Sequence, residues 1–408
     1  MKKSKQQDLL SKVEDAVRQI EKSGRDKVPI HSMIDAIVRE LGGELGIFGA
    51  RLYERGGEEY VLLATFPGGL TVDDSVRVPR DYAPMELCLM RGVVYMQADD
   101  PRLDRELEEI LGAKEFAAVE VGAERYVIAF DVEPGRREDV VNALGVIRHA
   151  VTQKIREQQA EEIFHQAKLI QTSIMPDESP SFHFYDIAGR SDSLDSVGGD
   201  LFDYIPIHDG IMGIAIADAS GHGLPAALQV RDVYMGLRMG MARDLKIVRT
   251  VERLNQIIHS STLSSRFVSL FYGELEASGL FIYVNAGHPA PFHLPKSPNR
   301  QVMRLQQGGP ILGPLGDATY DRGFVRLEPG DVLVLYTDGI TETRDRAANE
   351  PGEAGEEYGV ARLEAVVNRH RDESAESILD AIFQDINDFS DGAPTEDDRT
   401  VIVIRYPD

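Results

Sequence analysis

An apolar run of strand length that ends on a carboxylate is the feature that most constrains this chain. Residues 211–217 are apolar or glycine, Asp218 follows them, and Gly221 and Gly223 come shortly afterwards. A strand without alternating polar residues is typical of one that is covered on both faces. The two glycines permit backbone conformations and close approaches that side chains forbid. This stretch therefore predicts a buried strand that delivers an acid to a site.

Three further aspartates stand in similar positions. Asp200 follows two glycines, Asp338 follows the apolar residues 332–336, and Asp397 directly precedes a strand-like segment at 400–404. Each of them alone could be a solvated turn residue. Together, without a Cys/His cluster, they favour a hard cation such as Mg²⁺ or Mn²⁺ over Zn²⁺. Two ions about 3.5 to 4 Å apart could activate a shared water and hold a phosphoryl group for in-line attack.

Composition argues against several classes of protein. The chain has 408 residues, a formal net charge of −24 and one cysteine, Cys88, which stands among apolar residues and is expected to be a buried structural thiol. The acidic charge does not favour nucleic acid, and one cysteine cannot form an intramolecular disulfide. No apolar stretch approaches the roughly 18 residues of a membrane span, and the start of the chain lacks a signal-peptide core. We expect a cytoplasmic protein of two or three domains without membrane insertion.

The N-terminal third predicts a helix followed by a small α+β domain. Residues 1–24 carry apolar residues at helical spacing and predict an amphipathic helix. Residues 25–135 predict a helix, then strands with inserted helices, which is an α+β order. This order resembles a GAF domain, as does Gly49-Ala50-Arg51-Leu52-Tyr53 with the hairpin after it. The resemblance implies that the domain receives a small-molecule or protein signal or mediates dimerisation.

A long helix is predicted to connect the two halves, over residues 136–175. Apolar residues recur along it at spacings of three and four, with a change of register between Ile155 and Ala160, and Pro176 ends the pattern. We interpret it as a coiled-coil-like helix of a homodimer. A helix that packs only on its own domain is the alternative.

Residues 176–408 form the second predicted domain, in which strands dominate. Short motifs occur in one order over about residues 165–408: Val197-Gly198-Gly199-Asp200; Asp218-Ala219-Ser220-Gly221-His222-Gly223 with Ala226-Ala227; Asn285-Ala286-Gly287-His288-Pro289; Tyr336-Thr337-Asp338-Gly339 with Glu342; and Asp397-Asp398-Arg399-Thr400. Together they resemble the PP2C-like serine/threonine phosphatases of the SpoIIE and RsbU family.

The resemblance implies a fold and a metal centre. The fold would be an α-β-β-α sandwich of two antiparallel sheets, which makes the whole chain α+β. Asp218 would bridge two Mn²⁺ or Mg²⁺ ions, and the carbonyl of Ala219 would complete the shell of the second ion. Asp200, Asp338 and Asp397 would hold the first or an accessory ion, and whether a third ion binds is left open. The substrate would be a phosphorylated anti-sigma factor antagonist of the STAS type.

Other residues near these motifs receive no catalytic role. Asp398 is expected to be a hydrogen-bonding neighbour, and His222 a turn residue more than a general acid. His288 is expected to shape its loop, and Asp203 to face away from the site because it lies three residues after Asp200 on a strand. Arg190 is a weak candidate for a phosphate-binding arginine.

The sequence therefore predicts a metal-dependent protein serine/threonine phosphatase that is regulated by its N-terminal sensor. An inactive sensor or scaffold of a partner-switching pathway is one alternative, against which the complete set of acids argues. A metal-dependent phosphohydrolase of small molecules is another, although no Walker-type nucleotide motif is present. The sequence leaves open the signal, the substrate protein, the preferred metal and the effect of dimerisation on activity.

Overall fold

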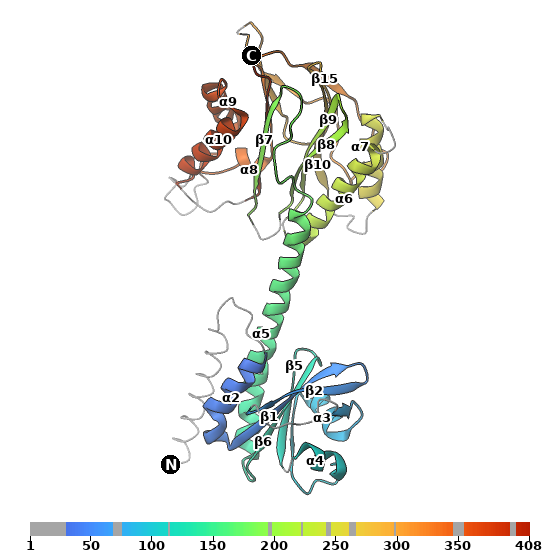
Figure 1. Cartoon of the computed structure of the whole chain (residues 1–408), viewed down its shortest axis with the longest axis vertical. Helices are drawn as coiled ribbons and strands as arrows, with labels where there is room; N and C mark the ends of the chain where they lie inside the picture. Colours follow the sequence, from blue (N-terminus) through green and yellow to red (C-terminus); the bar gives the residue numbers. More distant parts are fainter. Residues whose placement is uncertain are drawn as a thin grey trace. The chain divides into compact units, whose positions relative to one another are not determined.

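The structure is a computed structural model, and it divides the chain into two compact units (Figure 1). It describes residues 30–67, 76–112, 115–194, 198–221, 223–241, 246–260, 267–297, 299–345, 355–391 and 397–408. The first unit ends at Glu162, and the second runs from Ile163 to Asp408. The helix predicted at residues 1–24 lies outside the described residues.

The first unit is built on a six-stranded antiparallel sheet with the strand order β3-β2-β1-β6-β5-β4. Its strands are β1 (Ile47–Gly56), β2 (Glu59–Phe66), β3 (Arg77–Pro79), β4 (Val93–Met96), β5 (Phe116–Val121) and β6 (Tyr126–Val132). Its helices are α2 (Ile30–Leu45), α3 (Ala83–Arg91), α4 (Arg105–Leu111) and the first part of α5 (Arg137–Thr172).

Two apolar cores cover the two faces of this sheet. Successive strand residues point to opposite faces, so Leu52 packs with α2 and α5 while its neighbour Tyr53 packs with α3. Cys88 of α3 is buried in the second core, and burial raises the pKa of its thiol to about 12. It is therefore a structural thiol, as predicted. Helices on both faces of an antiparallel sheet are compatible with a GAF-like domain, and that assignment stays a prediction.

The second unit contains two sheets. One has the order β14-β11-β10-β9-β8, with β15 also paired to β11, and the other has the order β13-β12-β16-β17-β7. Pairing is antiparallel except for a short parallel contact between β11 and β14. The strands are β7 (Asp186–Asp192), β8 (Asp200–His208), β9 (Ile211–Ala219), β10 (Val268–Glu276), β11 (Leu280–Ala286), β12 (Phe292–Leu294), β13 (Met303–Arg304), β14 (Gly308–Gly309), β15 (Gly323–Arg326), β16 (Val332–Tyr336) and β17 (Arg399–Arg405).

Helices cover the outer face of each sheet, as Figure 1 shows for α6, α7, α9 and α10. The pair α6 (Leu224–Met241) and α7 (Ile247–Ser260) packs on one sheet, and α9 (Gly359–His370) and α10 (Ala375–Phe389) pack on the other. A third core, between the sheets, contains Ile214, Phe271, Leu335 and Ile402 among others. The predicted α+β class, with an α-β-β-α sandwich of antiparallel sheets, is confirmed.

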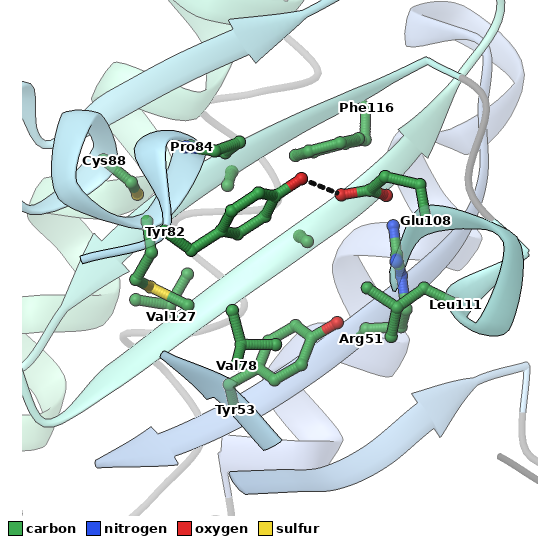
Figure 2. A pocket seen from close by; sticks show the side chains of 13 residues that line it. Arg51, Tyr53, Val78, Tyr82, Pro84, Cys88, Glu108, Leu111, Phe116 and Val127 are labelled. Carbon is green, nitrogen blue, oxygen red and sulfur yellow. Dashed lines mark hydrogen bonds between the residues drawn. The ribbon is translucent and has the colours of Figure 1, made fainter. Parts of the chain in front are cut away.

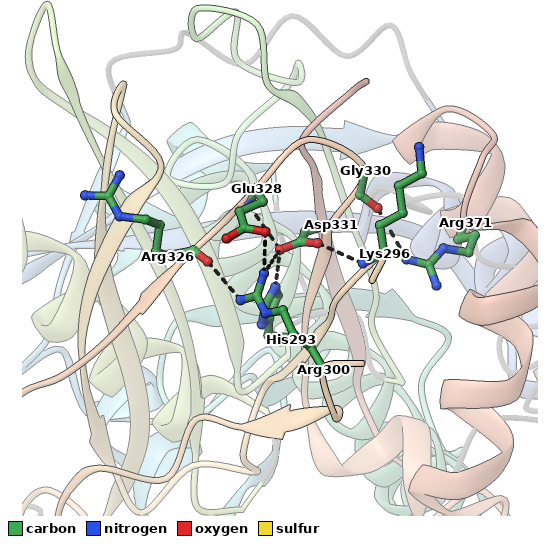
Figure 3. A network of polar contacts seen from close by, with 8 residues as sticks. All are labelled: His293, Lys296, Arg300, Arg326, Glu328, Gly330, Asp331 and Arg371. Atoms are coloured by element: carbon green, nitrogen blue, oxygen red, sulfur yellow. Dashed lines mark hydrogen bonds and ion pairs between the residues drawn. The ribbon is translucent and has the colours of Figure 1, made fainter. Parts of the chain in front are cut away.

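A buried His–Asp pair holds the sheet at the end remote from the predicted site (Figure 3). His293 Nε2 lies 2.8 Å from Asp331 Oδ2, and both side chains are 1% exposed. Asp331 also accepts hydrogen bonds from the backbone N–H of Lys296 and from Arg300. Against burial, which would raise it, the hydrogen bond with His293 and those from the backbone N–H groups of Lys296 and Glu328 hold the pKa of Asp331 below its usual value. Asp331 precedes β16 and Asp338 follows it, so the His–Asp pair lies at the opposite end of this strand from the predicted site. The pair is therefore structural.

None of the helices in the described part of the chain is both long and apolar enough to span a bilayer.

Candidate metal centre

Two paired strands place the first two acids side by side. Asp200 begins β8, Asp218 lies near the end of β9, and the register of the two strands sets them directly opposite each other. Side chains that are directly opposite in an antiparallel pair share a face of the sheet. The Asp200 carboxylate points toward the second sheet, because its Oδ2 accepts hydrogen bonds from the hydroxyls of Thr337 at 2.8 Å and Thr400 at 2.6 Å. Both acids therefore face the gap between the sheets at one end of the sandwich.

The second sheet brings the other two acids to the same end. Asp338 opens the short helix α8 (Asp338–Thr341) directly after β16, and Asp397 lies just before β17. Strands β16 and β17 are paired, and the backbone N–H of Thr337 donates to the carbonyl of Thr400 at 3.0 Å. Gly339 permits this approach, because a Cβ there would clash with the backbone carbonyl of Asp398. The loop before β17 is thus packed against the start of α8.

Asp398 fixes the backbone that leads into Asp200. Its Oδ1 accepts from the N–H of Leu194 at 2.7 Å, and its Oδ2 accepts from the N–H of Gly199 at 2.5 Å. The N–H of Asp398 itself donates to Asp397 Oδ1 at 2.8 Å. The predicted hydrogen-bonding role of Asp398 is confirmed. The carbonyl of Ala219 lies close to Gly199, since a Cβ on that glycine would be 2.9 Å from it.

Burial and neighbouring acids raise the pKa values of Asp218 and Asp200. Burial, together with the charges of Asp338, Asp397, Asp398 and Glu342, raises the pKa of Asp218 to about 7. Burial and then the charge of Asp218 raise the pKa of Asp200 well above its usual value, against the hydrogen bonds of the two threonines. Negative charge therefore gathers at this end of the sandwich. No Lys, Arg or His side chain is among the causes of these two pKa shifts.

The donor set fits hard divalent cations by its chemistry. The groups are carboxylate oxygens with one nearby carbonyl, which are the ligands that Mg²⁺ and Mn²⁺ prefer. Buried like charges are costly unless cations neutralise them. Within the described residues, however, no group of three His, Cys, Asp or Glu side chains is arranged to hold one ion. The predicted ligands share an end of the sandwich without forming a closed coordination shell.

Three other residues considered in the sequence have different outcomes. Asp203 pairs with Arg238 of α6, with atoms 2.9 Å apart, so it faces away from the acids as predicted. Arg190 pairs with Asp192 and lies over the ring of Phe383, which leaves it engaged away from the acids. His222 lies outside the described residues.

The loop that carries His288 connects to the site through a serine. Asn285 binds both the N–H and the carbonyl of His288, at 2.8 and 3.0 Å, which fixes the loop as expected. The Nδ1 atom of His288 lies 2.8 Å from the hydroxyl of Ser269, and both residues are buried. Ser269 lies directly opposite Asp218 in the pairing of β10 with β9.

Sequence reasoning missed the hydroxyl residues of this site. Thr337 and Thr400 are each within three residues of a predicted ligand, and Ser269 belongs to an apolar strand. For the two threonines, the available signal was their position inside the motifs. No local signal marks Ser269, because its neighbour Asp218 is separated from it in sequence by two helices.

Comparison with known proteins identifies the second unit. Residues 208–407 match the family model of the stage II sporulation protein E, SpoIIE. The phosphoserine phosphatase RsbU of Bacillus subtilis is 26% identical over 240 residues, which are 58% of this chain and 68% of RsbU. Protein IcfG of Synechocystis is 25% identical over 312 residues, which are 67% of this chain but 47% of IcfG.

A solved structure supports the fold. The SiaA-PP2C domain of Pseudomonas aeruginosa covers 62% of this chain and 98% of its own length, with a TM-score of 0.52 and 21% identity. This likeness concerns the fold alone. The match to the SpoIIE family model and the similarity to RsbU show that the second unit is a SpoIIE-type PP2C phosphatase domain, homologous to RsbU and SpoIIE.

Proposed function

We propose that this chain is a metal-dependent phosphatase that hydrolyses phosphoserine or phosphothreonine in a protein. The observation that carries the proposal is the pairing of Asp200 with Asp218 at the strand ends, where burial and neighbouring acids raise the pKa of Asp218 to about 7. A cation that binds between such buried carboxylates offsets the free-energy cost of their like charges. The naming of RsbU as a phosphoserine phosphatase supports the reaction.

The proposed ligands of Mn²⁺ or Mg²⁺ are Asp200, Asp218, Asp338, Asp397 and the carbonyl of Ala219. Bound there, two such ions would lower the pKa of a shared water and neutralise the oxygens of the phosphoryl group. This mechanism requires no serine or cysteine nucleophile.

The chain's own residues would orient these ligands. Thr337 and Thr400 donate to one oxygen of Asp200, which leaves its other oxygen for a cation. Asp398 holds the N–H of Gly199 and so fixes the entry to β8. Hydrogen bonds to a ligating carboxylate typically contribute to metal affinity and not only to stability.

The proposed substrate is a phosphorylated anti-sigma factor antagonist of the STAS type, in the cytoplasm. The similarity to RsbU supports this substrate class. We further propose that the first unit is a GAF-like sensor, that the chain is a homodimer, and that α5 carries the signal. A sedimentation measurement that gave the mass of one chain at micromolar concentration would contradict the homodimer.

The test is hydrolysis by the purified chain of a phosphoserine peptide, p-nitrophenyl phosphate and a nucleoside triphosphate, with Mn²⁺, Mg²⁺ or EDTA. We expect metal-dependent turnover of the peptide and loss of that turnover in Asp218→Asn, which keeps the shape of the side chain. Turnover of the nucleotide alone would identify a small-molecule phosphohydrolase. No turnover with any metal, by the full chain and by residues 176–408, would favour a scaffold.

A further inference from the structure

A partly open pocket lies in the first unit, between the sheet and the helices α3 and α4 (Figure 2). Its volume is about 30 Å³, which is more than the roughly 10 to 15 Å³ that a single water molecule requires. Its walls are mainly apolar, and the rings of Tyr53, Tyr82 and Phe116 supply flat surfaces. This pocket belongs to the unit without the acids, so it is separate from the proposed metal centre.

Two polar atoms in the wall of this pocket are buried and have no hydrogen-bond partner among the described residues. They are Nε of Arg51, a residue that is 3% exposed, and Oε2 of Glu108, a residue that is 7% exposed. The other ends of both groups are engaged: Arg51 Nη2 binds Asp131 Oδ1 at 2.7 Å, and the hydroxyl of Tyr82 donates to Glu108 Oε1 at 2.7 Å. Figure 2 shows both groups at the same end of the pocket.

This arrangement presents one donor and one acceptor to whatever fills the pocket. A buried polar group without a partner is costly, so an occupant that satisfies both atoms gains free energy. A ligand carboxylate would be repelled by Glu108, and a ligand ammonium would be repelled by Arg51. The charges therefore select a neutral ligand.

We propose that this pocket binds a small neutral molecule with an amide-type edge and an apolar body. The ligand carbonyl accepts from Arg51 Nε, and the ligand N–H donates to Glu108 Oε2. Burial raises the pKa of Glu108, against the hydrogen bond from Tyr82 and the charge of Arg51, which both favour the carboxylate. Arg51 lies over the ring of Phe116, with 5.7 Å from its guanidinium carbon to the ring centroid, which fixes the direction of the donor.

The test uses the full chain labelled with ¹³C at its methionine methyl groups. Met85 lines the pocket, whereas Met90 lies on the same helix and is 72% exposed, so its signal reports nonspecific binding. The probes are propionamide, propionate and propylamine, which have similar size but differ in charge. We expect propionamide alone to shift the Met85 signal saturably, with roughly millimolar affinity, as ligands of five heavy atoms commonly have. Equal shifts with all three probes, or none with propionamide, would overturn the proposal.

Glu108→Gln tests the chemistry of recognition without changing the size of the pocket. The glutamine carbonyl can still accept from Tyr82, which turns its N–H₂ toward the ligand and removes the negative charge. The pocket then offers donors only, and we expect its preference to switch from propionamide to propionate. An unchanged preference would remove Glu108 from the site.

Ala118→Leu tests whether the pocket itself is the binding site, because Ala118 lies in its wall and is 4% exposed. The larger side chain should abolish the response of Met85 to propionamide. The dispersion of the other methionine signals checks that this variant folds. A full response in a folded Ala118→Leu chain would place the ligand elsewhere and overturn the assignment.

Discussion

Thr400 donates its hydroxyl to Oδ2 of Asp200 at 2.6 Å, although the two residues are 200 positions apart and lie in different sheets. The bond joins the first residue of β8 to β17 across the sandwich. It also joins a predicted metal ligand to the strand that follows Asp397. The position of Asp200 therefore depends on the packing of the two sheets and not on its own turn alone.

Thr400→Val should weaken metal binding, because it replaces the hydroxyl with a methyl group of similar size. Loss of a hydrogen bond to a ligating carboxylate typically costs about 10- to 100-fold in metal affinity or activity. The measurement is the Mn²⁺ concentration that gives half-maximal phosphatase activity. The matched control is Thr250→Val, since Thr250 is buried in α7 and its hydroxyl has no partner among the described residues. An equal loss in both variants would show that the effect is not specific to Asp200.

The stability of the metal-free chain should fall as the pH rises from about 4 to about 7. The pKa of Asp218 is raised from 3.8 to about 7, so the folded state binds a proton more tightly than the unfolded state. The stabilisation is fully present below the unfolded pKa and is lost as the pH rises through the folded pKa. A pKa shift of this size corresponds to a change of about 4 kcal/mol in the free energy of unfolding. The measurement is the free energy of unfolding of the second unit in EDTA across this pH range.

Two comparisons isolate the contribution of Asp218 to that pH dependence. Asp218→Asn removes its titration and should flatten the slope, leaving the part due to Asp200, whose pKa is raised in the same direction. Saturating Mn²⁺ should reverse the slope, because protons compete with the cation for the carboxylates. A slope unchanged by both would mean that Asp218 does not titrate in this range.

The local part of this site could be predicted from the sequence, whereas its tertiary part could not. Asp218, Asp338 and Asp397 each lie at the end of an apolar segment, and such patterns are local. The donors to Asp200 come from residues 137 and 200 positions away, and nothing in their own segments specifies that carboxylate as their partner. The same holds for the fold: apolar runs predicted buried strands, but their order in the two sheets depends on long-range pairing.

Ser269→Ala should destabilise the second unit by about 1 to 3 kcal/mol, because it removes the partner of a buried histidine nitrogen. The Ser269 hydroxyl is the partner of Nδ1 of His288, so the variant would leave that buried ring nitrogen without this hydrogen bond. Chemical denaturation measures the change. The control is Ser278→Ala, since Ser278 lies exposed in the turn between β10 and β11. A loss below about 0.5 kcal/mol would show that the Ser269 hydroxyl is dispensable.

Arg238→Met should destabilise the second unit more than the loss of a surface ion pair does. The side chain of Asp203 is 3% exposed, and Arg238 binds both of its oxygens, at 3.1 and 2.9 Å. Removing the arginine leaves a buried carboxylate without its partner, which costs several kcal/mol in fully buried pairs; because Arg238 is 42% exposed, we expect about 2 kcal/mol.

The matched control is Arg249→Met in α7, where Arg249 pairs with Glu252 and is 75% exposed. Exposed pairs contribute roughly 0 to 1 kcal/mol, so this variant should unfold at nearly the wild-type denaturant concentration. Because Asp203 faces α6 and not the acids, Arg238→Met should keep the Mn²⁺ dependence of the wild type while it folds. A changed Mn²⁺ dependence at full folding would connect this ion pair to the metal centre and contradict the separation of Asp203 from Asp200.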